Sequence, residues 1–168
     1  MAVSAHGPTE LLRSPRERVS PRARLMWMLT DLLRLAPVAA LLVLGDGPWN
    51  LFTVPAWLWW TLLAVAVLYV GVVPQWRYLV HRWEVTETAV YTQTGWWARE
   101  RRIAPMSRVQ TVDHREGAIA RLFGLATVRV TTASSAGALT IEGLEQQRAL
   151  AIVEELTRMA DSVPGDAT

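Results

Sequence analysis

The sequence predicts an α+β membrane protein, in which a two-helix transmembrane hairpin precedes a small antiparallel β-domain capped by a C-terminal helix. Three observations support this class. Most of the apolar excess lies between residues 25 and 73. From Arg77 the chain changes to short segments of alternating polarity. The last long segment, 144–160, has apolar residues at helical spacing, and no βαβ alternation precedes it.

Residues 1–24 are rich in Pro, Ser, Arg and Glu and show no long apolar period. We expect them to form a mobile basic tail. The tail either lies on anionic lipid or is simply disordered.

The hairpin is predicted over residues 25–74, with helices at about 25–44 and 51–73. The second stretch (LFTVPAWLWWTLLAVAVLYVGVV) has no charge. At about 1.5 Å per residue it spans roughly 34 Å, enough for a hydrocarbon core of about 30 Å.

The first stretch is interrupted by Asp31 and Arg34, which are three residues apart and share a helix face. This intramembrane polar pair either contacts a partner helix or is a self-paired ion pair near the interface, with Arg34 extending toward the headgroups. A signal peptide is the alternative for this segment, but no small-x-small cleavage pattern follows Leu44.

The arginine distribution predicts the orientation. Five arginines precede the first helix, Arg77 and Arg82 follow the second, and the connecting loop has no basic residue. The positive-inside rule therefore places both termini in the cytoplasm of a multi-pass protein of the cell (inner) membrane.

Residues 75–161 are predicted to form a cytoplasmic domain. Its strands are expected at 78–85, 89–94, 99–103, 108–112, 125–132 and 138–141, with a short helical turn at 117–124. In the closing helix, Leu150, Val153, Leu156 and Ala160 share one face. Residues 162–168 are expected to fray.

Four short motifs resemble one family. They are WEVT at 83–86, IAPMSRVQTV at 103–112, GAIARLFGLA at 117–126 and VRVTTA at 128–133. Together with two preceding transmembrane helices, they closely resemble the YdbS-like, membrane-flanked bacterial PH-like domain family. Ala118 departs from the family pattern, which often has proline there, and this difference affects only the local turn.

The resemblance implies a PH-like fold, a bent seven-stranded barrel or sandwich closed by the C-terminal helix. It implies no catalytic mechanism and no agreed ligand site. Some eukaryotic PH domains bind phosphoinositides, but that is an analogy at the level of the fold alone.

The densest basic cluster consists of Arg99, Arg101, Arg102 and Arg108. These side chains are candidate contacts for lipid phosphates or an acidic partner, because guanidinium groups match phosphate geometry. The alternative is a solvated strand face beside an anionic membrane.

Trp96 and Trp97 follow Gly95 at an expected hairpin tip. If exposed, they are candidate contacts to the membrane or to a partner; if buried, they fill the barrel.

No catalytic, cofactor or metal site is predicted. The chain has no cysteine, and its three histidines are far apart. Asp113 and His114 with Ser107 or Ser134 lack a nucleophile elbow, and ordinary turn and strand roles explain them better. The net charge of +2 does not suggest nucleic acid.

The leading hypothesis is a non-enzymatic binding or scaffold module at the inner face of the membrane, in contact with lipids and with a membrane protein partner or a second copy. The alternative is a lipid-headgroup binder or sensor that uses the arginine cluster. An enzyme or transporter is the third possibility, for which two helices form no obvious pathway.

Overall fold

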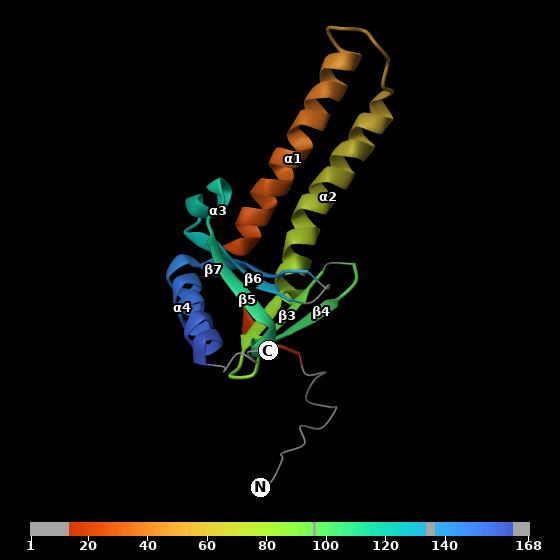
Figure 1. Ribbon diagram of the computed structural model, residues 1–168. Helices are drawn as coiled ribbons and strands as arrows, with labels where there is room; N and C mark the ends of the chain where they lie inside the picture. Colours follow the sequence, from red (N-terminus) through yellow and green to blue (C-terminus); the bar gives the residue numbers. More distant parts are fainter. Residues whose placement is uncertain (1–13, 96, 134–136, 163–168) are drawn as a thin grey trace.

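The computed structural model describes residues 14–95, 97–133 and 137–162, which form four α-helices, a 3₁₀ turn and seven strands (Figure 1). The helices are α1 (Ala23–Asp46), α2 (Ala56–Val80), α3 (Ala118–Leu122) and α4 (Gln146–Ser162). The strands are β1 (Glu17–Arg18), β2 (Arg82–Val85), β3 (Ala89–Thr94), β4 (Glu100–Pro105), β5 (Val109–Arg115), β6 (Leu125–Thr132) and β7 (Leu139–Glu145). The 3₁₀ turn is η1 (Met106–Arg108).

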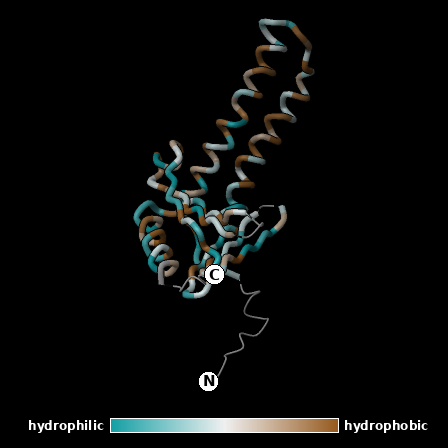
Figure 2. The backbone as a smooth tube through the Cα atoms, in the orientation of Figure 1, coloured by the Kyte–Doolittle hydropathy of each residue, from teal (hydrophilic) through white to brown (hydrophobic). Residues whose placement is uncertain are grey.

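Helices α1 and α2 form a long hairpin that projects from one end of the domain (Figure 1). Both are long and apolar enough to cross a membrane, and Figure 2 shows them largely in the colours of hydrophobic residues. Helix α1 extends beyond its expected bounds at both ends, whereas α2 begins five residues later than expected and ends seven residues later. Pro74 lies inside α2 rather than at its exit, and 78–80, expected in a strand, belong to the helix. Helix α2 therefore continues into the domain and ends at Val80, just before β2 begins at Arg82.

The domain is a sandwich of two antiparallel sheets, which confirms the α+β class. One sheet has the order β1-β2-β3-β4 and the other has the order β5-β6-β7. Helix α4 packs on the second sheet. Its buried face is formed by Ala149, Ile152 and Leu156. The prediction of Leu150 on that face was wrong, because its side chain is 46% exposed.

The expectation of a mobile tail over residues 1–24 is corrected from residue 14 onward; residues 1–13 lie outside the described part. Glu17 and Arg18 pair with Trp83 and Arg82 and thereby add β1 to the edge of the first sheet. The chain thus forms one strand, leaves the domain as the hairpin, and returns to form the neighbouring strand. The hairpin is an insertion in the sandwich between two paired strands.

The core of the domain includes the start of α1. Val19, Ala23, Met26 and Trp27 are buried in the same cluster as the apolar side chains of both sheets and α4. Gly143 on β7 permits this approach, because a Cβ there would lie 2.7 Å from the Ala23 Cβ. Its φ of +77° is also one that glycine adopts without strain. The helix therefore begins inside the fold.

Candidate membrane-proximal binding site

Strand β4 separates the predicted arginine cluster onto different faces. Side chains alternate along a strand, so Arg101 points to the outer face of the first sheet and Arg102 to the inner face. Arg99 lies just before the strand, on the side of Arg101. Arg108 ends the 3₁₀ turn beyond the opposite end of β4. The four residues therefore do not form a single site.

A different arginine group crosses the outer face of the first sheet. The register pairs Arg18 with Arg82, Arg82 with Gln93, and Gln93 with Arg101. Directly paired residues project from the same face, so these four side chains form one row across four strands. Sequence reasoning missed Arg18 and Arg82 as members of the group, because the row exists only once β1 has paired with β2.

Beside the two middle members of this row, Arg82 and Gln93, and next to α2 is a cavity of about 460 Å³, which we call the arginine pocket. Arg82 and Arg99 supply the charge, Trp76 and Leu79 of α2 form an apolar wall, and the lining contains no carboxylate. The lining residues are Ser14, Trp76, Leu79, Val80, Arg82, Gln93 and Arg99.

Gln93 fixes the geometry of the arginine pocket. Its side-chain Nε2 donates to the Val80 carbonyl at 3.0 Å, satisfying an otherwise unpaired carbonyl at the end of α2. Its Oε1 accepts a hydrogen bond of 3.0 Å from Arg101 Nε, and Arg101 also donates to Ser14 Oγ at 3.1 Å. The buried Gln93 amide thus connects β3 to the end of α2 and to β4, and Arg101 extends this connection to the segment before β1.

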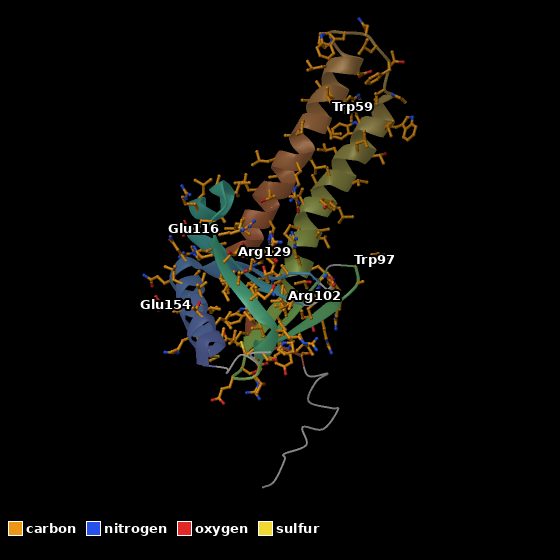
Figure 3. The ribbon with its side chains drawn as sticks, in the orientation of Figure 1. Trp59, Trp97, Arg102, Glu116, Arg129 and Glu154 are labelled. Atoms are coloured by element: carbon orange, nitrogen blue, oxygen red, sulfur yellow. The ribbon has the colours of Figure 1, made fainter. Side chains whose placement is uncertain are left out.

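A second cavity, of about 280 Å³, lies where α2 meets the inner faces of both sheets; we call it the mixed-charge pocket. Arg102 pairs with Glu100 at 2.7 Å, and Arg77 pairs with Glu142 at 3.8 Å. All four line the cavity, so its positive charges are balanced by its own carboxylates. Figure 3 labels Arg102 on β4 and Trp97 on the turn that precedes this strand.

His81 also lines the mixed-charge pocket and is 4% exposed. Its ring lies 5.8 Å from that of Trp27, and its Nε2 has no hydrogen-bond partner among the described residues. Burial, with a smaller contribution from Arg77, lowers the pKa of His81 from 6.5 to about 4. The imidazole is therefore neutral at physiological pH.

Trp97 lies on the turn between β3 and β4, beside the domain end of α2 (Figure 3). It is 88% exposed. With Val72, Val73 and Trp76 it lines an open, largely apolar cavity of about 390 Å³, which we call the apolar cleft. Of the two alternatives considered for this tryptophan, exposure is the observed one. Trp96 lies outside the described residues.

Asp31 and Arg34 contact each other within α1, with 3.5 Å between Asp31 Oδ1 and the Arg34 guanidinium. The Asp31 side chain is only 6% exposed, whereas that of Arg34 is 70% exposed. The carboxylate is thus buried inside the protein, and the guanidinium faces outward.

The described residues offer no metal site, because no group of three or more candidate ligands occurs among them. Asp113 and His114 are neighbours on β5, so their side chains project from opposite faces. His114 instead lies 3.7 Å from Glu116. Asp113 and His114 are therefore not arranged as an acid–base pair for hydrolysis in this part of the chain, and Ser134 lies outside it.

Comparisons with known proteins cover both the hairpin and the domain. A family model described as "Bacterial PH domain" matches residues 27–160. The UPF0699 transmembrane protein YdbS of Bacillus subtilis (strain 168) is 30% identical over 151 residues, which are 87% of this chain and 93% of that protein. No solved structure matches.

Proposed function

Because the chain belongs to the bacterial PH domain family and is a membrane protein, we propose that it is a non-enzymatic scaffold module. The module sits at the inner face of the cell membrane, with both termini in the cytoplasm, and engages a partner membrane protein. The observation that carries this proposal is the insertion of the hairpin between two paired strands of the sandwich.

This insertion fixes the orientation of the domain relative to its membrane helices. Trp27 of α1 is buried in the domain core, and α2 continues to within two residues of β2. Arg24 further connects the helices by a hydrogen bond of 3.2 Å to Gln75. A domain held this way presents the same surface to every neighbouring membrane protein. Because both proteins are confined to the membrane, the effective concentration of the domain near its partner is high, and even weak contacts can be occupied.

The surface for the partner is the groove between α1 and α2. It has a volume of about 690 Å³ and an entirely apolar lining that includes Ala36, Ala39, Ala66 and Gly71. Small residues let two membrane helices approach closely, where packing rather than a hydrophobic effect stabilises the contact. We assign the groove to one transmembrane helix of the partner protein.

The orientation rests on charge asymmetry. Arginines lie only at the domain end of the hairpin or inside α1, and the loop at 47–55 contains no charged residue. Since the chain has no cysteine, Thr53→Cys and Arg158→Cys provide single labelling sites. In intact cells, a membrane-impermeant maleimide should label the first and not the second; the reverse pattern would contradict the orientation.

The partner is tested by photo-cross-linking in native membranes, with a benzophenone amino acid replacing Val67 in the groove. We expect one adduct with another membrane protein. The adduct should disappear in a Gly71→Leu background, because this side chain fills the groove while its Cβ meets nothing within 4 Å in the chain itself. Val65→Leu is the matched control, since Val65 is 60% exposed and outside the groove.

Two outcomes would contradict the proposal. An adduct that persists equally in both variants would show that the groove is not the contact surface. An adduct of two identical chains would assign the groove to self-association instead.

A further inference from the structure

We propose that the arginine pocket and the apolar cleft together bind one anionic phospholipid from the leaflet that faces the domain. Arg82 and Arg99 hold the phosphate, and the first part of an acyl chain lies along Val72, Val73 and Trp76. This site goes beyond the scaffold function and does not depend on the partner or on the groove between the helices.

The charge of the arginine pocket favours an anion. Neither Arg82 nor Arg99 forms an ion pair within the described part of the chain. Glu84, which projects from the same face as Arg82, contacts Arg16: the Arg16 backbone N–H donates to it at 3.2 Å. A phosphate can therefore accept bidentate hydrogen bonds from guanidinium groups that no carboxylate of the pocket neutralises.

The position of the pocket favours a lipid over a soluble phosphate. The arginine pocket and the apolar cleft are both lined by Trp76, so a polar cavity and an apolar one lie next to each other along α2. Between Trp57 and Trp76 the helix rises about 28 Å, close to the thickness of a hydrocarbon core of about 30 Å. Trp76 therefore marks the interface on the domain side, with Trp97 beside it and Arg82 just beyond it.

The mixed-charge pocket is a weaker candidate for the same ligand. Its Arg77 and Arg102 already face Glu142 and Glu100, and a phosphate there would have to displace one of these carboxylates or lie beside it. Like charges at such short range oppose binding. The balance of charge, rather than the number of arginines, distinguishes the two cavities.

Native mass spectrometry of the full chain in mild detergent tests the site, with equal amounts of phosphatidylglycerol and phosphatidylcholine as probes. We expect one phosphatidylglycerol retained per chain in preference to phosphatidylcholine. Arg82→Gln/Arg99→Gln should reduce the retained fraction about tenfold. The matched control, Arg108→Gln/Arg158→Gln, removes the same charge from exposed positions away from the pocket and should retain the lipid.

Additional variants keep the test decisive. If the first double variant does not fold, Arg99→Gln alone changes an exposed side chain and should lower retention about threefold. Trp97→Ser should accelerate loss of the lipid, because it removes one wall of the cleft. Equal loss in the two double variants, equal retention of both lipids, or displacement by a large excess of inorganic phosphate would overturn the proposal.

Discussion

The two ends of the transmembrane hairpin are built differently. At the domain end, Trp27 is 3% exposed, and the Arg77 guanidinium lies 4.9 Å from the centre of its ring. The Arg24 guanidinium lies 4.6 Å from the ring of Tyr78. At the far end, Trp49 and Trp57 are 57% and 67% exposed. The same helices are thus part of a protein core at one end and face lipid at the other.

This difference shows that the hairpin both anchors the domain and forms part of its hydrophobic core. At the far end, lipid supplies the apolar surroundings and few protein contacts are needed. At the domain end, the helices contribute to the burial that stabilises the sandwich. Substitutions at the two ends should therefore have very different effects on the domain.

The largest effect is expected where α1 meets β7. Gly143→Val places a branched side chain at a φ of +77° and 2.7 Å from the Ala23 Cβ. The combination of backbone strain and overpacking should cost about 2 to 5 kcal/mol. Thermal unfolding in mild detergent would measure it. Gly117→Ala is the control, because its Cβ meets nothing within 4 Å. Similar losses of stability in the two variants would contradict the close contact between Ala23 of α1 and Gly143 of β7.

A pair of tryptophan substitutions compares the two ends directly. Trp27→Ala leaves a cavity in the core and should lower the free energy of unfolding by about 3 kcal/mol. Trp57→Ala removes a side chain that faces lipid and should change the stability of the domain by less than about 0.5 kcal/mol. The domain can be followed by proteolysis of detergent-solubilised protein. Equal sensitivity of the two variants would mean that α1 does not support the sandwich.

The domain end should also be sensitive to acid through His81. Its folded pKa of about 4 lies below the ordinary value of 6.5, so between these values the unfolded chain binds more protons. Stability should be full above about pH 6.5 and fall by about 2 kcal/mol on acidification to pH 5. The melting temperature of the wild type should show this slope.

The control for the acid effect is His81→Gln, which does not titrate. Groups around the pocket, including Glu100, Glu142, Arg77 and Arg102, remain in both proteins. An identical pH slope in the variant would assign the effect to those groups instead of His81.

The smallest effect is expected at the far end. The Val54 N–H donates to Asp46 Oδ1 at 2.5 Å, and Trp59 Nε1 donates to Oδ2 at 3.1 Å. Asp46→Ala should loosen residues 47–55 at a cost of about 1 kcal/mol. Hydrogen exchange should rise there, while that of β2 to β7 stays unchanged. In Asp46→Asn, which keeps one acceptor oxygen, the exchange at residues 47–55 should lie between that of the wild type and that of Asp46→Ala. Increased exchange throughout the sandwich would contradict the independence of the two ends of the hairpin.

The predictions from sequence succeeded where the pattern is local. The uncharged run at 51–73 was sufficient to identify α2, and alternation at 125–132 identified β6 with its observed bounds. Gly117 to Gly124 was correctly expected to contain a short helix, α3. The ends of elements were less accurate. The sequence predicts a helix end at residue 73, just before Pro74, whereas the helix accommodates this proline and continues to Val80.

The candidate site could be predicted only in part. The sequence singled out Arg99, Arg101 and Trp97. Arg99 lines the arginine pocket, Arg101 donates a hydrogen bond to Gln93 of that pocket, and Trp97 lines the apolar cleft. Arg102 and Arg108 do not belong with them, because strand alternation and the length of β4 separate them. Arg18 and Arg82 could not be added from sequence, since the hairpin lies between them.

The sequence by itself therefore determined the class of the protein: a membrane hairpin, an antiparallel domain and a closing helix. These features follow from the hydrophobic period of single segments. Only the tertiary structure decided that β1 precedes the hairpin, that α1 begins in the core, and that Arg82 and Arg99 share a pocket. The physical reason is that a two-residue strand has no period to detect, and its partners, Arg82 and Trp83, lie 64 and 66 residues further along the chain.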